Sequence, residues 1–108
     1  MSGGVPAEGS PPGAGGPTGL LARYLRLTRE AIELVRPGTP ERSFLRGGSD
    51  DVLAMARSYL ADAEHFSTIG DLERALAAVS YAHGWLDAGV RLGLLDGGGD
   101  ASRFTLFR

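Results

Sequence analysis

His83 and Asp87 are the pair of residues in this 108-residue chain whose types and spacing best suit chemistry. They are four residues apart in a segment with helical spacing, so the carboxylate could orient the imidazole on the neighbouring turn. Tyr59 or Tyr81 could add a hydroxyl group. Such a site would suit acid–base catalysis or the binding of a small ligand.

The same histidine has a structural interpretation, which we favour. A histidine at the margin of a helical core packs like an aromatic ring and forms local hydrogen bonds without a catalytic role. His65 falls on a polar helix face, where we expect it to be solvated. A metal site would need a third ligand, and neither helix offers a histidine and carboxylate trio at the usual spacing. We therefore predict no catalytic residue, metal or cofactor, and keep an enzyme or ligand-binding protein using His83 and Asp87 as the alternative.

Composition excludes several other chemistries. The chain has no cysteine, which removes disulfides and thiol nucleophiles, and all eleven basic residues are arginine, which removes lysine chemistry. A net charge of −2, with arginines dispersed among acids, argues against nucleic-acid binding. No apolar run approaches the ~18 residues of a membrane helix. We expect a cytoplasmic protein; the arginine preference is interpreted as compositional and is compatible with a thermophilic source.

Aromatic residues around His83 define a candidate interaction surface. Tyr81, Trp85 and Leu92 fall on one side of the predicted helix, roughly opposite a narrow polar strip. Exposed aromatic side chains anchor protein interfaces, so this surface needs a partner. The sequence leaves three candidates open: another part of the chain, a second copy in a homodimer, or a different protein.

Three amphipathic segments must position these residues. The first extends from Leu20 to Val35, and Pro37-Gly38 stops it. In the connection that follows, Thr39-Pro40-Glu41 is expected to form a single helical turn with Thr39 as its cap. We expect Phe44 and Leu45 to pack that connection against the core.

The second and third segments form a predicted antiparallel hairpin. Ser49 or Asp50 is expected to cap the second segment, whose seam alternates between spacings of four and three at Val52, Ala56, Tyr59, Ala63 and Phe66. Gly70 would supply the left-handed residue that ends it, and Asp71 would cap the third segment. A connection this short allows only an antiparallel pair. The fold class is therefore an all-α, up-and-down antiparallel bundle of three main helices.

The chain outside these segments is predicted to be irregular. Residues 1–19 contain mainly Gly, Pro, Ala and Ser, too little apolar surface to offset the entropy of ordering them, so we expect a disordered tail before a bundle domain at 20–108. Phe104, Leu106 and Phe107 alternate with polar residues, which predicts a short extended tail across the third helix.

Glycines inside the third segment are also informative. Gly84, Gly89 and Gly93 each lower helix propensity by up to about 1 kcal/mol relative to alanine. We therefore expect each of them to permit a close backbone approach. A phosphate-binding role for the later run Gly97-Gly98-Gly99 has little support, because that run follows a helix instead of preceding one.

The hairpin resembles a known family. Residues 59–66 read Tyr-Leu-Ala-Asp-Ala-Glu-His-Phe, residues 74–89 read Arg-Ala-Leu-Ala-Ala-Val-Ser-Tyr-Ala-His-Gly-Trp-Leu-Asp-Ala-Gly, and Arg-Leu-Gly-Leu follows at 91–94. This pattern is similar to short archaeal proteins grouped as domain of unknown function 357. The resemblance covers about residues 20–107, implies a small helical bundle without an assigned activity, and carries over no catalytic residues.

A second, more distant similarity is to helical domains of prokaryotic nucleotide-binding and toxin systems. Ribonucleases among them use an arginine followed, after four to six intervening residues, by a histidine on the same helix, whereas Arg57 and His65, or Arg74 and His83, are spaced too widely. We therefore expect a non-enzymatic interaction or assembly module from an archaeal cytoplasm.

Overall fold

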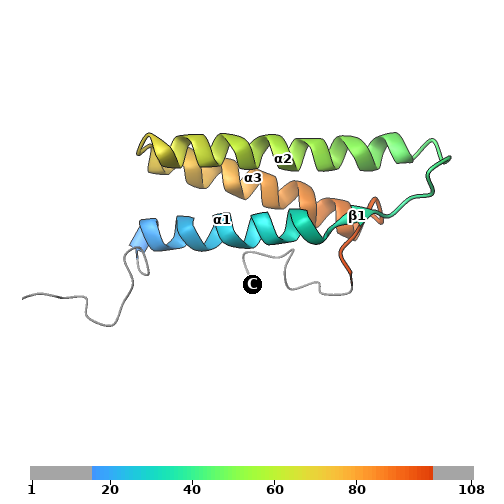
Figure 1. Cartoon of the computed structure of the whole chain (residues 1–108), viewed down its shortest axis with the longest axis horizontal. Coiled ribbons are helices and arrows are strands. Elements are labelled where there is room, and N and C mark those ends of the chain that lie inside the picture. Colours follow the sequence, from blue (N-terminus) through green and yellow to red (C-terminus); the bar gives the residue numbers. More distant parts are fainter. Residues whose placement is uncertain (1–15, 99–108) are drawn as a thin grey trace, which may run out of the picture.

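Three helices form the body of the protein. The computed structural model describes residues 16–98, apart from the side chain of Pro17. The helices are α1 (Gly16–Leu34), α2 (Arg46–Thr68) and α3 (Leu72–Arg91), and consecutive helices run in opposite directions (Figure 1). α3 packs along α2 and also against α1, whereas α1 and α2 contact each other less. The predicted all-α, up-and-down bundle is confirmed.

The core consists of two apolar clusters, one toward each end of the bundle. The cluster nearer the α2–α3 turn contains Leu21, Tyr24, Leu25, Ala63, Ala75, Ala78 and Val79. The other contains Ala31, Val35, Val52, Leu53, Ala56, Leu86 and Leu95. On α1 and α3 the residues between the two sets include Thr28 and His83, and both are buried. A polar layer therefore separates the two halves of the core.

The α2–α3 turn has the predicted local chemistry. Gly70 has a φ of 80°, in the left-handed region that glycine adopts without a steric penalty. The Asp71 side chain accepts a hydrogen bond from the backbone N–H of Arg74 at 3.2 Å, which caps α3. Both predictions for this turn are confirmed, and the short turn sets the antiparallel pairing of the hairpin.

The start of α2 differs from the prediction. The helix begins at Arg46, without a side-chain cap, so the predicted cap at Ser49 or Asp50 is wrong. Ser49 is instead buried inside the helix, and its hydroxyl shares a hydrogen bond of 2.8 Å with the hydroxyl of Thr39. The side chain that a local pattern marks as a cap is used to hold the preceding connection against α2.

The connection itself is held by polar contacts. The Ser43 N–H donates to the Pro40 carbonyl at 3.0 Å, a single turn in place of the predicted helical one. The Arg46 guanidinium donates to the Thr39 carbonyl at 3.2 Å. Because these bonds fix the backbone, Phe44 points outward and is 93% exposed, with Leu45 also exposed. The predicted packing of Phe44 and Leu45 on the core is wrong.

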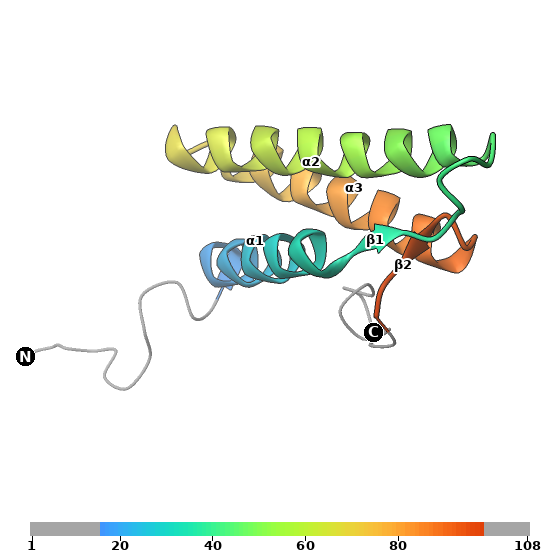
Figure 2. The same cartoon turned by 45° about the vertical axis from the view of Figure 1, so that its right-hand side comes forward.

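A two-stranded ladder closes the end of the bundle. β1 (Arg36–Pro37) pairs antiparallel with β2 (Leu95–Asp96), and the two lie side by side in Figure 2. Leu95 is thereby buried in the core beside α1 and α2. The sequence patterns did not predict these strands, because each has two residues and its partner lies far away in the sequence.

The helix boundaries leave part of the tail predictions outside the described residues. α1 begins at Gly16, four residues before the predicted start at Leu20. Pro17 suits a first helical turn, because its missing N–H would have no partner there. Residues 1–15, and the C-terminal Phe104, Leu106 and Phe107, lie outside the described part of the chain.

Candidate functional site: an aromatic groove between α2 and α3

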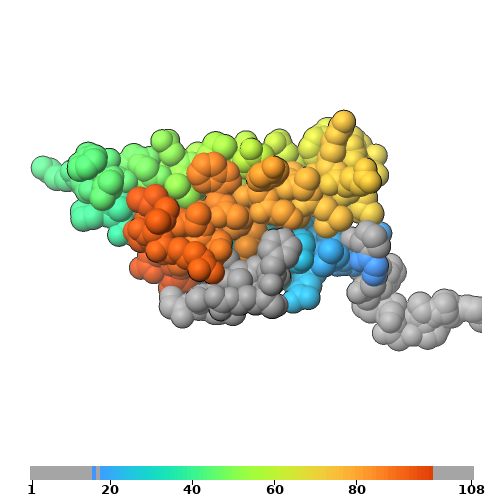
Figure 3. Space-filling view, turned by 180° about the vertical axis from the view of Figure 1, so that it is seen from behind, coloured from blue at the N-terminus to red at the C-terminus, as the bar shows by residue number. Residues whose placement is uncertain are grey.

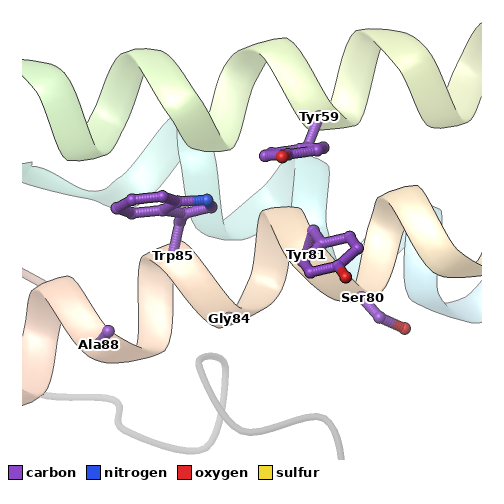
Figure 4. A pocket seen from close by; sticks show the side chains of 6 residues that line it. All are labelled: Tyr59, Ser80, Tyr81, Gly84, Trp85 and Ala88. Carbon is purple, nitrogen blue, oxygen red and sulfur yellow. The ribbon is translucent and has the colours of Figure 1, made fainter.

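An apolar groove runs between α2 and α3 on the face of the hairpin turned away from α1 (Figure 4). Its volume is about 370 Å³. Six residues line it, and the polar atoms among their side chains are hydroxyl groups and an indole N–H: Tyr59, Ser80, Tyr81, Gly84, Trp85 and Ala88. The groove can therefore take up apolar groups and a few hydrogen bonds, without a charged side chain in its lining.

Two contacts between the helices set the register that forms the groove. The Tyr59 and Tyr81 rings stack with their centroids 5.3 Å apart and an interplanar angle of 29°. Seven residues further along α2 and seven residues back along α3, the Arg74 guanidinium lies 5.9 Å from the centroid of the Phe66 ring. The same antiparallel register places Met55, an exposed residue of α2, opposite Trp85.

The lining residues of α3 form two rows, one of large aromatic side chains and one of small residues. Tyr81 and Trp85 are four residues apart on α3; the Trp85 ring rises toward α2, the Tyr81 ring lies over α3, and Gly84 lies between them (Figure 4). Tyr81 is 62% exposed and Trp85 37%. The row of small residues has the same spacing and consists of Ser80, Gly84 and Ala88. The large rings therefore stand beside a row that a partner could approach closely.

The predicted interaction surface is only partly contained in the groove. Tyr81 and Trp85 line it, whereas Leu92 lies one turn beyond Ala88 and is 73% exposed without lining it. Sequence reasoning missed the contribution of Tyr59 to this site. A usable signal was present, because Tyr59 and Tyr81 lie eleven residues before and after Gly70, so folding at that turn places them opposite each other.

The structure places His83 and Asp87 in different surroundings. His83 is 3% exposed, in the polar layer between the two core clusters. The Asp87 carboxylate accepts a hydrogen bond from Nε of Arg91 at 3.0 Å, one turn toward the C-terminus. His65 is exposed on α2, next to the Phe66 ring. Across residues 16–98, no three histidine, cysteine or acidic side chains gather as a metal site would require.

The three glycines singled out in the third predicted segment have different surroundings, and Gly93 lies beyond the end of α3 at Arg91. At Gly89 an added Cβ would lie 2.7 Å from Leu95 Cδ1 and 2.9 Å from Val52 Cγ1, so the prediction of close approach is confirmed. Gly93 has a φ of 79° and follows the end of the helix, and an added Cβ would meet no atom within 4 Å, so the predicted close approach is wrong at this residue. At Gly84 an added Cβ would meet no atom within 4 Å, so for this residue the prediction is wrong within the described chain.

Comparison with known protein families relates the chain to one of them. None of the described helices is both long and apolar enough to cross a membrane. The comparisons with curated proteins and with solved structures gave no match. A family model described as "Protein of unknown function (DUF357)" matches residues 23–95, which include every residue that lines the groove. Because this match spans more than half of the chain, the protein belongs to that family of unknown function.

Proposed function

We propose that this protein is a non-enzymatic interaction module whose aromatic groove receives an apolar helical segment of a protein partner. The observation that carries the proposal is the exposure of Tyr81 and Trp85 on a helical scaffold beside an open groove of about 370 Å³. Aromatic side chains of this kind supply most of the binding energy at many protein interfaces. The proposal keeps the expected cytoplasmic location, with which a chain without cysteine is compatible.

The shape of the groove favours a helix as the bound element. Its lining residues recur every three or four positions along α3, so the groove follows the helix axis and presents a ridge of rings beside a row of small residues. An amphipathic helix binds such a surface through apolar side chains at the same spacings. Another hollow, of about 400 Å³ near the α2–α3 turn, has no aromatic ring in its lining.

The alternative function, a small enzyme or ligand-binding protein using His83 and Asp87, has less support. Burial of His83 keeps it from a substrate in bulk solvent, and Asp87 is engaged by Arg91. Diethyl pyrocarbonate followed by mass spectrometry tests accessibility directly. We expect His65 to be modified in the folded protein and His83 only after unfolding. Modification of both at similar rates would favour the alternative.

Selection from a display library of helical peptides tests the interaction role. The chain has one tryptophan, so fluorescence of Trp85 reports binding in the groove. We expect selected peptides to shift its emission, and Tyr81→Ala to weaken their binding by about tenfold or more. Phe44→Ala, which truncates an exposed aromatic outside the groove, is the matched control and should leave binding unchanged. Equal binding to wild type and Tyr81→Ala would contradict the proposal.

A further inference from the structure

We infer that the helix received by the groove is α3 of a second copy of this chain, crossing the first α3 at Gly84 around a two-fold axis. The inference rests on the proposed function and names its partner. Figure 3 shows the face concerned, with α2 (green to yellow) above α3 (orange). Gly84 has no structural reason within residues 16–98.

Glycine disfavours a helix relative to alanine, so a glycine inside a helix usually has a packing or backbone reason. Gly89 has a packing reason in Leu95 and Val52, and Gly93 has a backbone reason in its positive φ. Gly84 lies in the middle of α3 with helical geometry and open space at the position of its missing side chain. An atom from outside the described chain would give Gly84 the same explanation as Gly89.

The face around Gly84 is complementary to itself. It carries a ridge, formed by Tyr81 and Trp85, next to a shallow row formed by Ser80, Gly84 and Ala88. A two-fold axis at Gly84 brings the small residues of the two copies together at the crossing and leaves the ridge of each copy beside the row of the other. An interface between two identical copies requires this pairing of a raised and a hollow part within one surface. A partner with a different surface would need only the hollow part.

The charge distribution is compatible with burial of this face. From Ala77 to Ala88, over three turns of α3, Asp87 is the one acidic or basic residue besides the buried His83. Its carboxylate is already paired with Arg91. At the α3 crossing itself, two copies can therefore approach without burying an unpaired charge of this helix segment.

The available area fits a reversible dimer. Tyr81 and Trp85 together expose on the order of 200 Å², taking ~150–250 Å² for a whole aromatic side chain. The face from Ala77 to Leu92 is about 22 Å long and two helices wide, a flat footprint of roughly 450 Å². Side chains make the accessible area of such a face larger than its footprint, which brings it near the ~600 Å² per partner at the lower end of stable interfaces. We therefore expect a dimer that dissociates on dilution.

Sedimentation equilibrium over a range of concentrations provides the first test. For the wild-type protein we expect the mass to rise from 11.3 kDa toward twice that value. Gly84→Leu should remain at the mass of one chain, because its side chain fills the row that the second copy needs. Ala61→Leu adds the same side chain at an exposed position of α2 outside the groove and should associate like the wild type.

A single cysteine provides the second test, since the natural chain has none. A residue at a two-fold crossing faces its own copy, and a disulfide needs Cα atoms ~4.4–6.8 Å apart. Under mild oxidation we expect Gly84→Cys to form a covalent dimer at least about tenfold faster than Ala61→Cys. This variant adds only a small side chain at an open position, so it also serves if Gly84→Leu perturbs folding.

Three results would overturn the inference. The first is a mass of one chain at every concentration together with equal cross-linking rates for the two cysteine variants. The second is equal loss of association in Gly84→Leu and Ala61→Leu. The third is a red shift of Trp85 emission on truncation after Gly98, without any dependence on concentration, which would identify residues 99–108 as the occupant. The interaction role itself fails separately, if selected peptides ignore Tyr81→Ala.

Discussion

Gly84 and Gly89 lie five residues apart on α3 and have opposite surroundings. Gly89 is enclosed by Leu95 and Val52, so even a methyl group there would overlap its neighbours. Gly84 faces open space. α3 therefore has two kinds of surface. Its inner face packs against the rest of the bundle, and the described chain leaves much of its outer face uncovered.

The contrast extends along both faces of α3. Val79, Ala82 and Leu86 are completely buried on the inner face, whereas Tyr81 and Leu92 on the outer face are mostly exposed. Apolar residues thus occur on both sides of the helix, but those on the inner side bury far more of their surface in the single chain and should stabilise it most. Apolar spacing alone therefore does not distinguish a surface used in folding from one available for recognition.

Removal of a large side chain from each face should give the greatest difference in stability. Leu86→Ala is expected to lower the free energy of unfolding by about 3 kcal/mol, because it leaves a cavity in the core. Leu92→Ala removes the same atoms from an exposed position and should change it by less than about 0.5 kcal/mol. Urea unfolding followed by circular dichroism measures both. Similar losses for the two variants would mean that the outer face also contributes to folding.

The two glycines should respond to alanine with opposite signs. Gly89→Ala is expected to destabilise the fold by about 1–2 kcal/mol, since the new methyl group overlaps Leu95 and Val52. Gly84→Ala should stabilise it by about 0.5–1 kcal/mol through helix propensity. Thermal unfolding in dilute solution, where association does not contribute, provides the measurement. A loss of stability in Gly84→Ala under those conditions would show that the single chain does use the space at this position.

The polar layer of the inner face provides a smaller test. Thr28 is completely buried, and its hydroxyl oxygen has no hydrogen-bond partner among the described residues. Thr28→Val keeps the shape of the side chain and removes the buried hydroxyl, so we expect a gain of about 1 kcal/mol in the free energy of unfolding. Ser49→Ala is the contrasting variant, because it breaks the hydrogen bond to Thr39 and should destabilise the protein. A loss of stability in Thr28→Val would indicate that the hydroxyl is hydrogen-bonded in solution.

The ion pair between α1 and α2 should have the smallest effect. Nε of Arg29 lies 2.6 Å from the Glu64 carboxylate, but both side chains are more than 40% exposed. A double-mutant cycle with Arg29→Ala and Glu64→Ala should give a coupling of about 0.5 kcal/mol, and added salt should reduce it. A coupling comparable to the Leu86→Ala loss would place surface electrostatics beside core burial in this bundle.

Much of the fold could be predicted from short segments of the chain. The apolar spacing of three and four residues identified the helices, and Gly70 and Asp71 identified the hairpin turn, because these preferences act within one turn of backbone. The sequence also predicted part of the candidate site, the residues that α3 contributes. Tyr81 and Trp85 were named from the pattern of α3, but the part of Tyr59 in the groove depends on the pairing of two helices.

Other features required knowledge of which distant segments meet. Ser49 has the composition of a helix cap, yet it is buried because Thr39 lies beside it after folding. Phe44 has the composition of a core residue, yet hydrogen bonds of its neighbours hold it outside.

The two glycines of α3 show the same division most clearly. Their residue type is identical, and their backbone geometry is helical at both positions. Local sequence therefore predicts the helix that contains them and a reason for each glycine to be there, because helix propensity depends on the residue and its near neighbours. The difference between them arises from packing across the bundle, where β2 brings Leu95 onto Gly89 while no described segment reaches Gly84.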